Sequence, residues 1–220
     1  MKKQILTIIG LALLCNVMSA QTTETQTEVQ TDTDTRDRMH FGIKAGGNYS
    51  NVYDSEGEEF DADGKLGFAG GVFLSIPIGT YLGVQPELMF SQRGFKATGR
   101  VLGANYEMTR TTNYLDIPLF LAIKPAPFIT LLAGPQFSYL LKQKDEFTSG
   151  DLTLNQEEEF ENEDIDKNTL CVVGGVDFNF ENIVVGARAG WDVKNNNGDE
   201  ASTTPRYKNV WMQATIGFRF

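Results

Sequence analysis

The sequence predicts an all-β fold, an eight-stranded antiparallel up-and-down β-barrel that crosses a membrane. Three observations lead to this prediction. From about residue 40 onward, apolar residues alternate with small, polar or charged residues with a period of two, which is typical of strands. The alternating runs number eight, and the connections between them are alternately short and long. A barrel of this kind has no unpaired strand edge, so it can lie in lipid.

The clearest run covers residues 113–124, where one face is aliphatic and the other is mixed. The aliphatic face holds Leu115, Ile117, Leu119, Leu121 and Ile123, and the mixed face holds Tyr114, Asp116, Pro118, Phe120 and Ala122. The same division recurs along the chain. The predicted strands cover residues 40–50, 65–76, 81–97, 106–123, 128–142, 168–180, 183–194 and 206–220.

The connections between these runs fall into two classes. Those at 77–80, 124–127 and 181–182 are short. Those at 51–64, 98–105, 143–167 and 195–205 are long and polar. Short turns at one end and long loops at the other are typical of outer-membrane barrels.

The same period is compatible with a soluble ligand-binding barrel, in which the apolar face would point inward. Two observations favour the membrane barrel. Many glycines fall on the polar face, where a narrow eight-stranded interior leaves little room for side chains. Aromatic residues gather near the ends of the apolar face, like the girdles at the two membrane interfaces. They are Phe41, Phe178, Phe180, Phe218 and Phe220 at the short-turn end, with Tyr49 and Tyr139 at the other.

The N-terminus predicts export. Residues 1–20 have a positive start, a short apolar core and small residues before Gln21, which indicates a cleaved signal peptide. The apolar core is too short to favour a membrane-spanning helix, and Leu14 before Cys15 disfavours a lipid anchor. Residues 21–39 form a Thr-rich leader that we expect to be disordered and periplasmic. Residues 40–220 form the barrel domain.

Composition excludes several function classes. The net charge of −10, with no basic patch, gives nucleic acid no electrostatic attraction. The single histidine, His40, excludes sites that need two imidazoles and disfavours acid–base catalysis. Cys171 is the only thiol after the signal peptide, so no internal disulfide forms there. We expect no cofactor and assign no catalytic residue.

Seven charged residues fall on the inward face and predict a charge network that plugs the lumen, because buried ions persist when they are paired. Within it we expect Glu87, Asp116 and Arg188 at similar heights. The alternative is a set of hydrated, independent charges. The seven residues are Lys44, Glu87, Arg93, Asp116, Asp177, Arg188 and Arg219.

The acidic excess lies in the long loops. Segment 145–166 carries ten acids and no base, and segment 54–63 carries six acids and no base. The simpler interpretation is a solvated, repulsive surface. The alternative is weak binding of divalent cations, which prefer several carboxylate oxygens. The candidates for such a site are Glu157, Glu158, Glu159, Glu161 and Asp164.

Segment 113–125, NYLDIPLFLAIKP, resembles the signature of the PorT-type outer-membrane β-barrels of Bacteroidetes, with supporting segments at 42–50, 134–141 and 217–220. The motif residues are Tyr114, Leu115, Asp116, Ile117, Pro118, Leu119 and Lys124. The resemblance implies an OmpA/OmpX-like barrel in the outer membrane with both termini in the periplasm. It also implies that the barrel-assembly machinery recognises the C-terminal aromatics, Phe218 and Phe220. The founding member is associated with a secretion apparatus, whereas most relatives have no assigned activity.

These observations predict a small, non-enzymatic outer-membrane protein with a structural or interaction role. Its expected partners are the membrane lipid, the assembly machinery during insertion, and periplasmic or secretion-system proteins. Three alternatives remain open: an accessory component of a secretion apparatus, a soluble ligand-binding barrel, and an outer-membrane hydrolase.

Overall fold

The computed structural model describes residues 34–54, 62–101, 104–149, 152–159, 169–193 and 207–220. The predicted signal peptide and residues 21–33 of the leader lie outside the described residues. Within the described ranges, no helix is long and apolar enough to cross a membrane.

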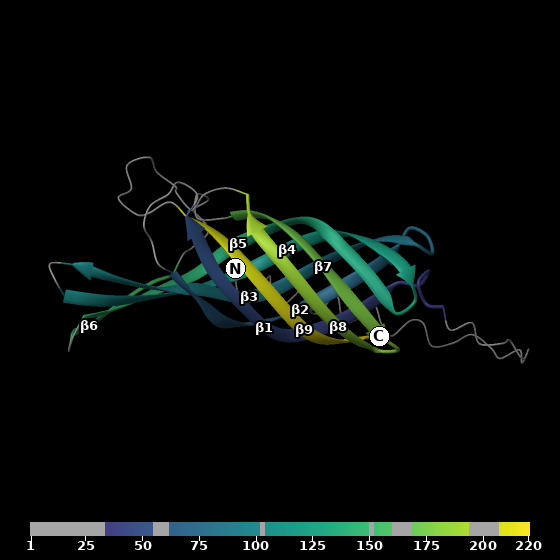
Figure 1. Ribbon diagram of the computed structural model, residues 1–220. Helices are drawn as coiled ribbons and strands as arrows, with labels where there is room; N and C mark the ends of the chain where they lie inside the picture. Colours follow the sequence, from purple (N-terminus) through teal and green to yellow (C-terminus); the bar gives the residue numbers. More distant parts are fainter. Residues whose placement is uncertain (1–33, 55–61, 102–103, 150–151, 160–168, 194–206) are drawn as a thin grey trace, which may run out of the picture. The chain divides into compact units, whose positions relative to one another are not determined.

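Nine strands form a single antiparallel sheet (Figure 1). Pairing of β1 with β9 and of β4 with β5 closes eight of them into a ring, which confirms the predicted barrel. The ninth strand, β6, pairs with the outer half of β5. The strands are β1 (His40–Asp54), β2 (Ala62–Pro77), β3 (Leu82–Val101), β4 (Ala104–Ala126), β5 (Ile129–Ser149), β6 (Leu152–Glu159), β7 (Thr169–Phe180), β8 (Ile183–Asp192) and β9 (Tyr207–Arg219).

The outward face of the barrel forms an apolar belt. On β4, Leu119 is 54% exposed while its neighbour Phe120 is 1% exposed, so the alternation places aliphatic side chains outside. Every outward position is apolar or glycine over a stretch long enough for the ~9–11 residues that a tilted strand needs to cross a bilayer. These stretches are 41–49, 66–74, 82–90, 115–123, 131–139, 170–178, 183–191 and 210–218. We name the end of the barrel with the connections β2–β3, β4–β5 and β7–β8 the short-turn end, and the opposite end the long-loop end.

Two of the predicted long loops are wrong in part. Segment 98–105 is largely strand, because β3 and β4 remain paired as far as Val101 and Ala104. Segment 143–167 contains the end of β5 and all of β6. Both extensions are polar, and a prediction based on apolar alternation underestimates strands that continue past the belt into water. A register shift between Asn113 and Tyr114 lies where β4 and β5 leave the belt, as is common for bulges at barrel rims.

The end of the predicted leader is ordered, so the prediction of disorder over 21–39 is wrong for Asp34–Met39, which we name the N-terminal strap. Arg36 Nη1 donates to the carbonyls of Lys124 and Pro125 at 3.3 and 3.4 Å, and Lys124 Nζ donates to the Arg36 carbonyl at 2.9 Å. The Arg36 guanidinium lies 4.8 Å from the Tyr81 ring centre. The strap is therefore held at the short-turn end by polar contacts. A segment with few apolar residues can still form such contacts.

A closed barrel should resist unfolding in detergent, because each barrel strand is paired on both sides within the belt. We expect the unboiled protein from the outer-membrane fraction to migrate faster on a denaturing gel than the boiled protein. A single band at one position in both samples, with partition into the aqueous phase, would contradict the membrane barrel.

The strap should respond to acid. Hydrogen bonds from the Arg36 side chain and backbone hold the pKa of the half-buried Asp34 carboxyl at about 2. Because this pKa is lowered, the ionised contact persists through the ordinary carboxyl range and is lost as the pH falls through about 2. We expect the NMR signals of the Tyr81 ring to shift with a midpoint near this pH. The shift should vanish in Asp34→Asn and persist in Asp37→Asn.

Candidate functional site

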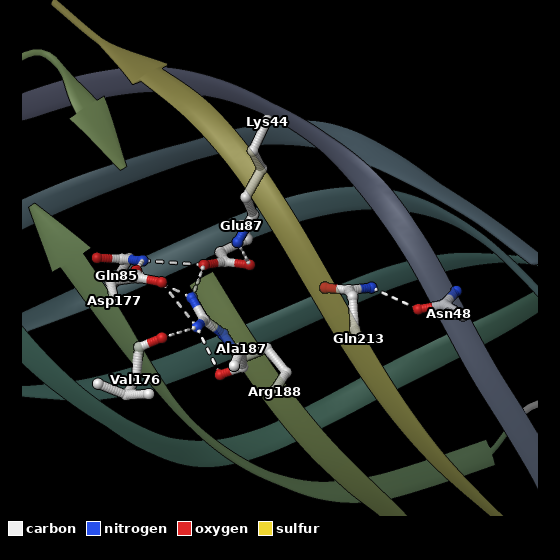
Figure 2. Close-up of polar contacts among 9 residues, drawn as sticks. All are labelled: Lys44, Asn48, Gln85, Glu87, Val176, Asp177, Ala187, Arg188 and Gln213. Carbon is white, nitrogen blue, oxygen red and sulfur yellow. Dashed lines mark hydrogen bonds and ion pairs between the residues drawn. The ribbon is translucent and has the colours of Figure 1, made fainter. Parts of the chain in front are cut away.

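The inward face carries a buried polar network, and its largest part is the Arg188 cluster (Figure 2). Arg188 donates to both carboxylate oxygens of Asp177, at 2.7 and 3.0 Å, and lies 3.5 Å from Glu87 Oε1. Lys44 Nζ lies 2.5 Å from Glu87 Oε2. Gln85 bridges the two acids, with Nε2 2.9 Å from Glu87 Oε1 and 3.3 Å from Asp177 Oδ2. The basic side chains of Lys44 and Arg188 thus pair with two acids. Each acid also accepts a hydrogen bond from the neutral Gln85 amide.

Four strands, β1, β3, β7 and β8, supply the Arg188 cluster, and glycines make room for it. A Cβ on Gly175 would lie 2.4 Å from Arg188 Cδ, and a Cβ on Gly186 would lie 2.6 Å from Asp177 Oδ1. Any larger residue at either position would displace the guanidinium or its partner. The glycines predicted on the inward face therefore provide the volume that the arginine occupies.

A second ion pair forms the Arg93 cluster. The Arg93 guanidinium pairs with the Asp116 carboxylate and lies 5.0 and 4.6 Å from the ring centres of Tyr114 and Trp211. Arg93 is 2% exposed, so aromatic faces replace its hydration. The Asp116 carboxylate therefore pairs with Arg93, apart from the ion pairs that Glu87 and Asp177 form with Lys44 and Arg188. The inward face therefore carries two separate neutral clusters. The alternation along a strand assigns a side chain to the inner or the outer face, but it does not give the position along the barrel axis that decides which inward charges can pair.

Neutral side chains fill the space around these clusters. Gln213 Nε2 donates to Asn48 Oδ1 at 2.9 Å, as Figure 2 shows, and Asn48 Nδ2 donates to Ser91 Oγ at 2.8 Å. The Cys171 thiol donates to Asp192 Oδ1 at 3.1 Å. All of these residues are fully or almost fully buried. The lumen in the described part of the barrel therefore holds hydrogen-bonded polar groups beside a buried apolar cluster. This cluster consists of Phe120, Ala122, Leu132, Cys171, Val173 and Trp211.

Arg219 does not join the network, which corrects its predicted place. It lies at the short-turn end, where Nε donates to the Glu181 carbonyl at 2.6 Å. His40 lies at the same end, with Nε2 3.1 Å from the Thr35 carbonyl and Nδ1 3.4 Å from the Phe220 carbonyl. Within the described residues, the hydrogen-bond contacts of His40 are to main-chain oxygens.

The motif residues divide between two environments. Tyr114, Asp116 and Pro118 face the lumen, while the aliphatic residues between them belong to the apolar belt. Lys124 lies at the short-turn end, bonded to the strap. Phe218 and Phe220 pack edge to face at 5.0 Å, and Phe220 stacks with Phe41 at 6.2 Å.

Three of the five cation candidates lie in the part of the chain that the structure describes. Glu157, Glu158 and Glu159 are the last residues of β6, and Glu161 and Asp164 lie outside the described residues. Within the described ranges, no group of three His, Cys, Asp or Glu residues is placed to hold a metal.

The alternation of inward and outward positions also identifies buried polar residues that the predicted network omits. Gln85 and Asp192 occupy inward positions on β3 and β8, and both are buried. Arg110 and Asp145 form a further ion pair at 2.6 Å at the long-loop end. Arg110 lies in the predicted strand 106–123, whereas Asp145 lies in the predicted loop 143–167. The signal for this pair was the polar alternation that continues beyond the belt.

A family model described as "Outer membrane protein beta-barrel domain" matches residues 20–197. The chain belongs to this family. No curated protein matches the chain. Family membership and the apolar belt place the barrel in the outer membrane. Its short-turn end then faces the periplasm and its long-loop end faces outward, as in other bacterial outer-membrane barrels.

Solved structures of similar barrels include Ail of Yersinia pestis, with 16% identity and a TM-score of 0.48, covering 82% of this chain and 98% of that chain. Neisserial surface protein A has 12% identity and a TM-score of 0.45, covering 82% and 97%. The N-terminal barrel domain of Pseudomonas aeruginosa OprF has 12% identity and a TM-score of 0.39, covering 82% and 97%.

Removal of one partner from the Arg188 cluster should destabilise the barrel, because Glu87 and Asp177 would keep a buried charge without its arginine. We expect Arg188→Ala to lower the free energy of unfolding by about 3–5 kcal/mol, measured by urea titration in lipid vesicles. Lys96→Ala is the control, since Lys96 forms an exposed ion pair with Glu107, and it should change stability by less than ~1 kcal/mol. A change below ~0.5 kcal/mol for Arg188→Ala would rule out a coupled network.

Proposed function

We propose that this protein is a non-enzymatic interaction protein of the outer membrane, which binds a partner outside the cell through the sheet that rises beyond the apolar belt. The observation that supports this proposal is the extension of β3, β4, β5 and β6 past the long-loop end of the barrel (Figure 1). The extension is built from paired strands, so it presents a fixed surface.

The protruding sheet has two different faces. Its inward face contributes Phe95, Ala97 and Met108 to a small apolar cluster that Val52 of β1 completes. Its outward face carries ion pairs between Lys96 and Glu107, at 3.7 Å, and between Lys144 and Glu146, at 2.6 Å. The apolar cluster supports the extension from inside, and the charged face keeps it in water.

The edge of this sheet can accept another strand. β5 pairs with β7 over Ile129–Ser138 and with β6 over Lys142–Ser149. β6 is the last strand in the sheet order, and no described strand pairs with its outer edge. Unpaired backbone N–H and C=O groups on such an edge bind extended segments by strand addition.

The packed lumen argues against transport. An eight-stranded barrel has an interior just wide enough to be filled by its own side chains. The Arg188 and Arg93 clusters occupy this interior with buried, paired charges. The narrow lumen and its contents therefore favour a role at the surface of the protein.

A photo-crosslinking residue at Asn155 in β6 tests the proposed surface on intact cells. We expect a discrete protein adduct, identified by mass spectrometry, that is lost when Thr153→Pro removes a backbone donor from β6. The same residue at Val185, in the apolar belt of β8, is the control and should capture only lipid. No protein adduct at Asn155, or the same adducts at both positions, would contradict the proposal.

A second probe addresses the role implied by the resemblance to PorT-type barrels. Met39 is 65% exposed in the strap and faces the periplasmic side. A crosslink from Met39 to a component of a secretion apparatus would identify the protein as an accessory of that apparatus. Protein adducts from Asn155 alone would favour the extracellular role.

Conductance provides an independent test of the plug. We expect the purified protein in a planar bilayer to show no stepwise ion conductance, because paired charges fill the lumen. Regular conductance steps from the wild-type protein would overturn the non-transport part of the proposal.

A further inference from the structure

The composition of β6 indicates which kind of strand its open edge accepts, an inference that rests on the proposed function. β6 pairs with β5 on one side, and within the described residues no strand pairs with its other side. The pairing runs from Ser149 opposite Leu152 to Lys142 opposite Glu159. β6 therefore leads from the tip of the protruding sheet back toward the barrel.

The acidic residues of β6 are gathered at one end of this edge. Residues 152–156 carry no charge, whereas residues 157–159 are three glutamates. The acidic end is the one near the barrel, because Lys142, which pairs with Glu159, also pairs with Asn113 where β4 and β5 leave the apolar belt. The open edge thus has an uncharged outer part and a negative base.

The strand behind this edge does not cancel the negative charge. Where it pairs with β6, β5 carries two lysines, Lys142 and Lys144, and two acids, Asp145 and Glu146. Lys144 pairs with Glu146 at 2.6 Å, and Asp145 pairs with Arg110 of β4 at 2.6 Å. The two acids of β5 and the three of β6 make five, which exceeds the two lysines even when Arg110 is added. The surplus at the edge is therefore negative.

The position of these acids disfavours a second copy of this chain as the partner. Two copies in one membrane have the same orientation, so both β6 strands run from the tip to the base. Neighbouring edges would then bring residues 157–159 of one copy beside the same residues of the other. Like charges on adjacent strands are destabilising, and charges on an edge strand commonly prevent self-association.

We propose that the open edge of β6 binds an extended segment of an extracellular protein that carries lysine or arginine beside residues 157–159. The backbone of β6 supplies the hydrogen bonds, and opposite charges on neighbouring strands supply the selectivity. Antiparallel pairing is the more stable arrangement. It places the basic residues at the N-terminal end of the bound segment and uncharged residues beside 152–156.

Synthetic peptides test this selectivity on the full-length protein in vesicles of zwitterionic lipid. The probe is a peptide of the same length as β6, with three lysines followed by alternating threonine and valine. The comparison peptide has three glutamates in place of the lysines. By fluorescence polarisation we expect the lysine peptide to bind at least about tenfold more tightly, because three cross-strand charge pairs change sign. Equal affinities, or no binding of the lysine peptide, would overturn the proposal.

Two triple variants distinguish pairing at the edge from general attraction to an acidic protein. Replacing the three glutamates of β6 by glutamine should remove most of the difference between the peptides. These changes are Glu157→Gln, Glu158→Gln and Glu159→Gln. The matched control removes three acids from the acidic segment 54–63 and should preserve the difference. Its changes are Glu56→Gln, Glu58→Gln and Glu59→Gln. An equal loss in both triple variants would show nonspecific attraction and contradict a site at the edge.

Failure of this inference can be told apart from failure of the proposed function. Thr153→Pro removes a backbone donor from β6 and should weaken binding of the lysine peptide. An affinity that this change leaves intact would show that the peptide binds away from the edge, against the proposal. If the adduct at Asn155 on cells is lost in Thr153→Pro but forms fully in the glutamine variant of residues 157–159, strand addition stands and a basic partner is excluded.

Discussion

The structure depends on one constraint: lipid offers no water to an unpaired backbone group, so a sheet in the membrane has to close on itself. Closure with eight strands fixes a narrow interior. The narrow interior then decides which residues fit there, and it places glycine beside arginine at Gly175 and Gly186. The same closure turns one face of each strand toward lipid, and that face carries the apolar belt. The plug and the belt are two results of a single requirement.

Charge inside this interior is tolerated because it is balanced locally. The Arg188 cluster and the Arg93 cluster are each neutral, and each cation is held by acids from other strands or by aromatic faces. Such pairs contribute little net stability compared with apolar packing, but the loss of one partner is costly. They therefore act chiefly to fix the relative heights of β1, β3, β4, β7 and β8. At the short-turn end, Lys124 and Arg219 donate instead to the carbonyl oxygens of Arg36 and Glu181.

The period of two was sufficient to predict the barrel, its strand number and the face of each residue, because side-chain direction in a strand depends only on parity. Parity could not give height. It therefore gave one network of seven charges without the partner of each, and it placed Arg219 in the lumen when this residue lies at the rim. The strap escaped prediction because its contacts are polar and join residues far apart in sequence, as between Arg36 and Lys124. β6 escaped because its alternation is mostly polar.

The seam of the barrel joins its first and last strands, with Gly42 opposite Arg219 and Asp54 opposite Tyr207. The two partners of this pairing are separated by almost the whole domain, so closure is the step with the highest loop entropy. Until β9 is complete, β1 and β8 each present an unpaired edge, which favours aggregation. β9 is thus the strand that removes both open edges at once and turns an open sheet into a closed barrel.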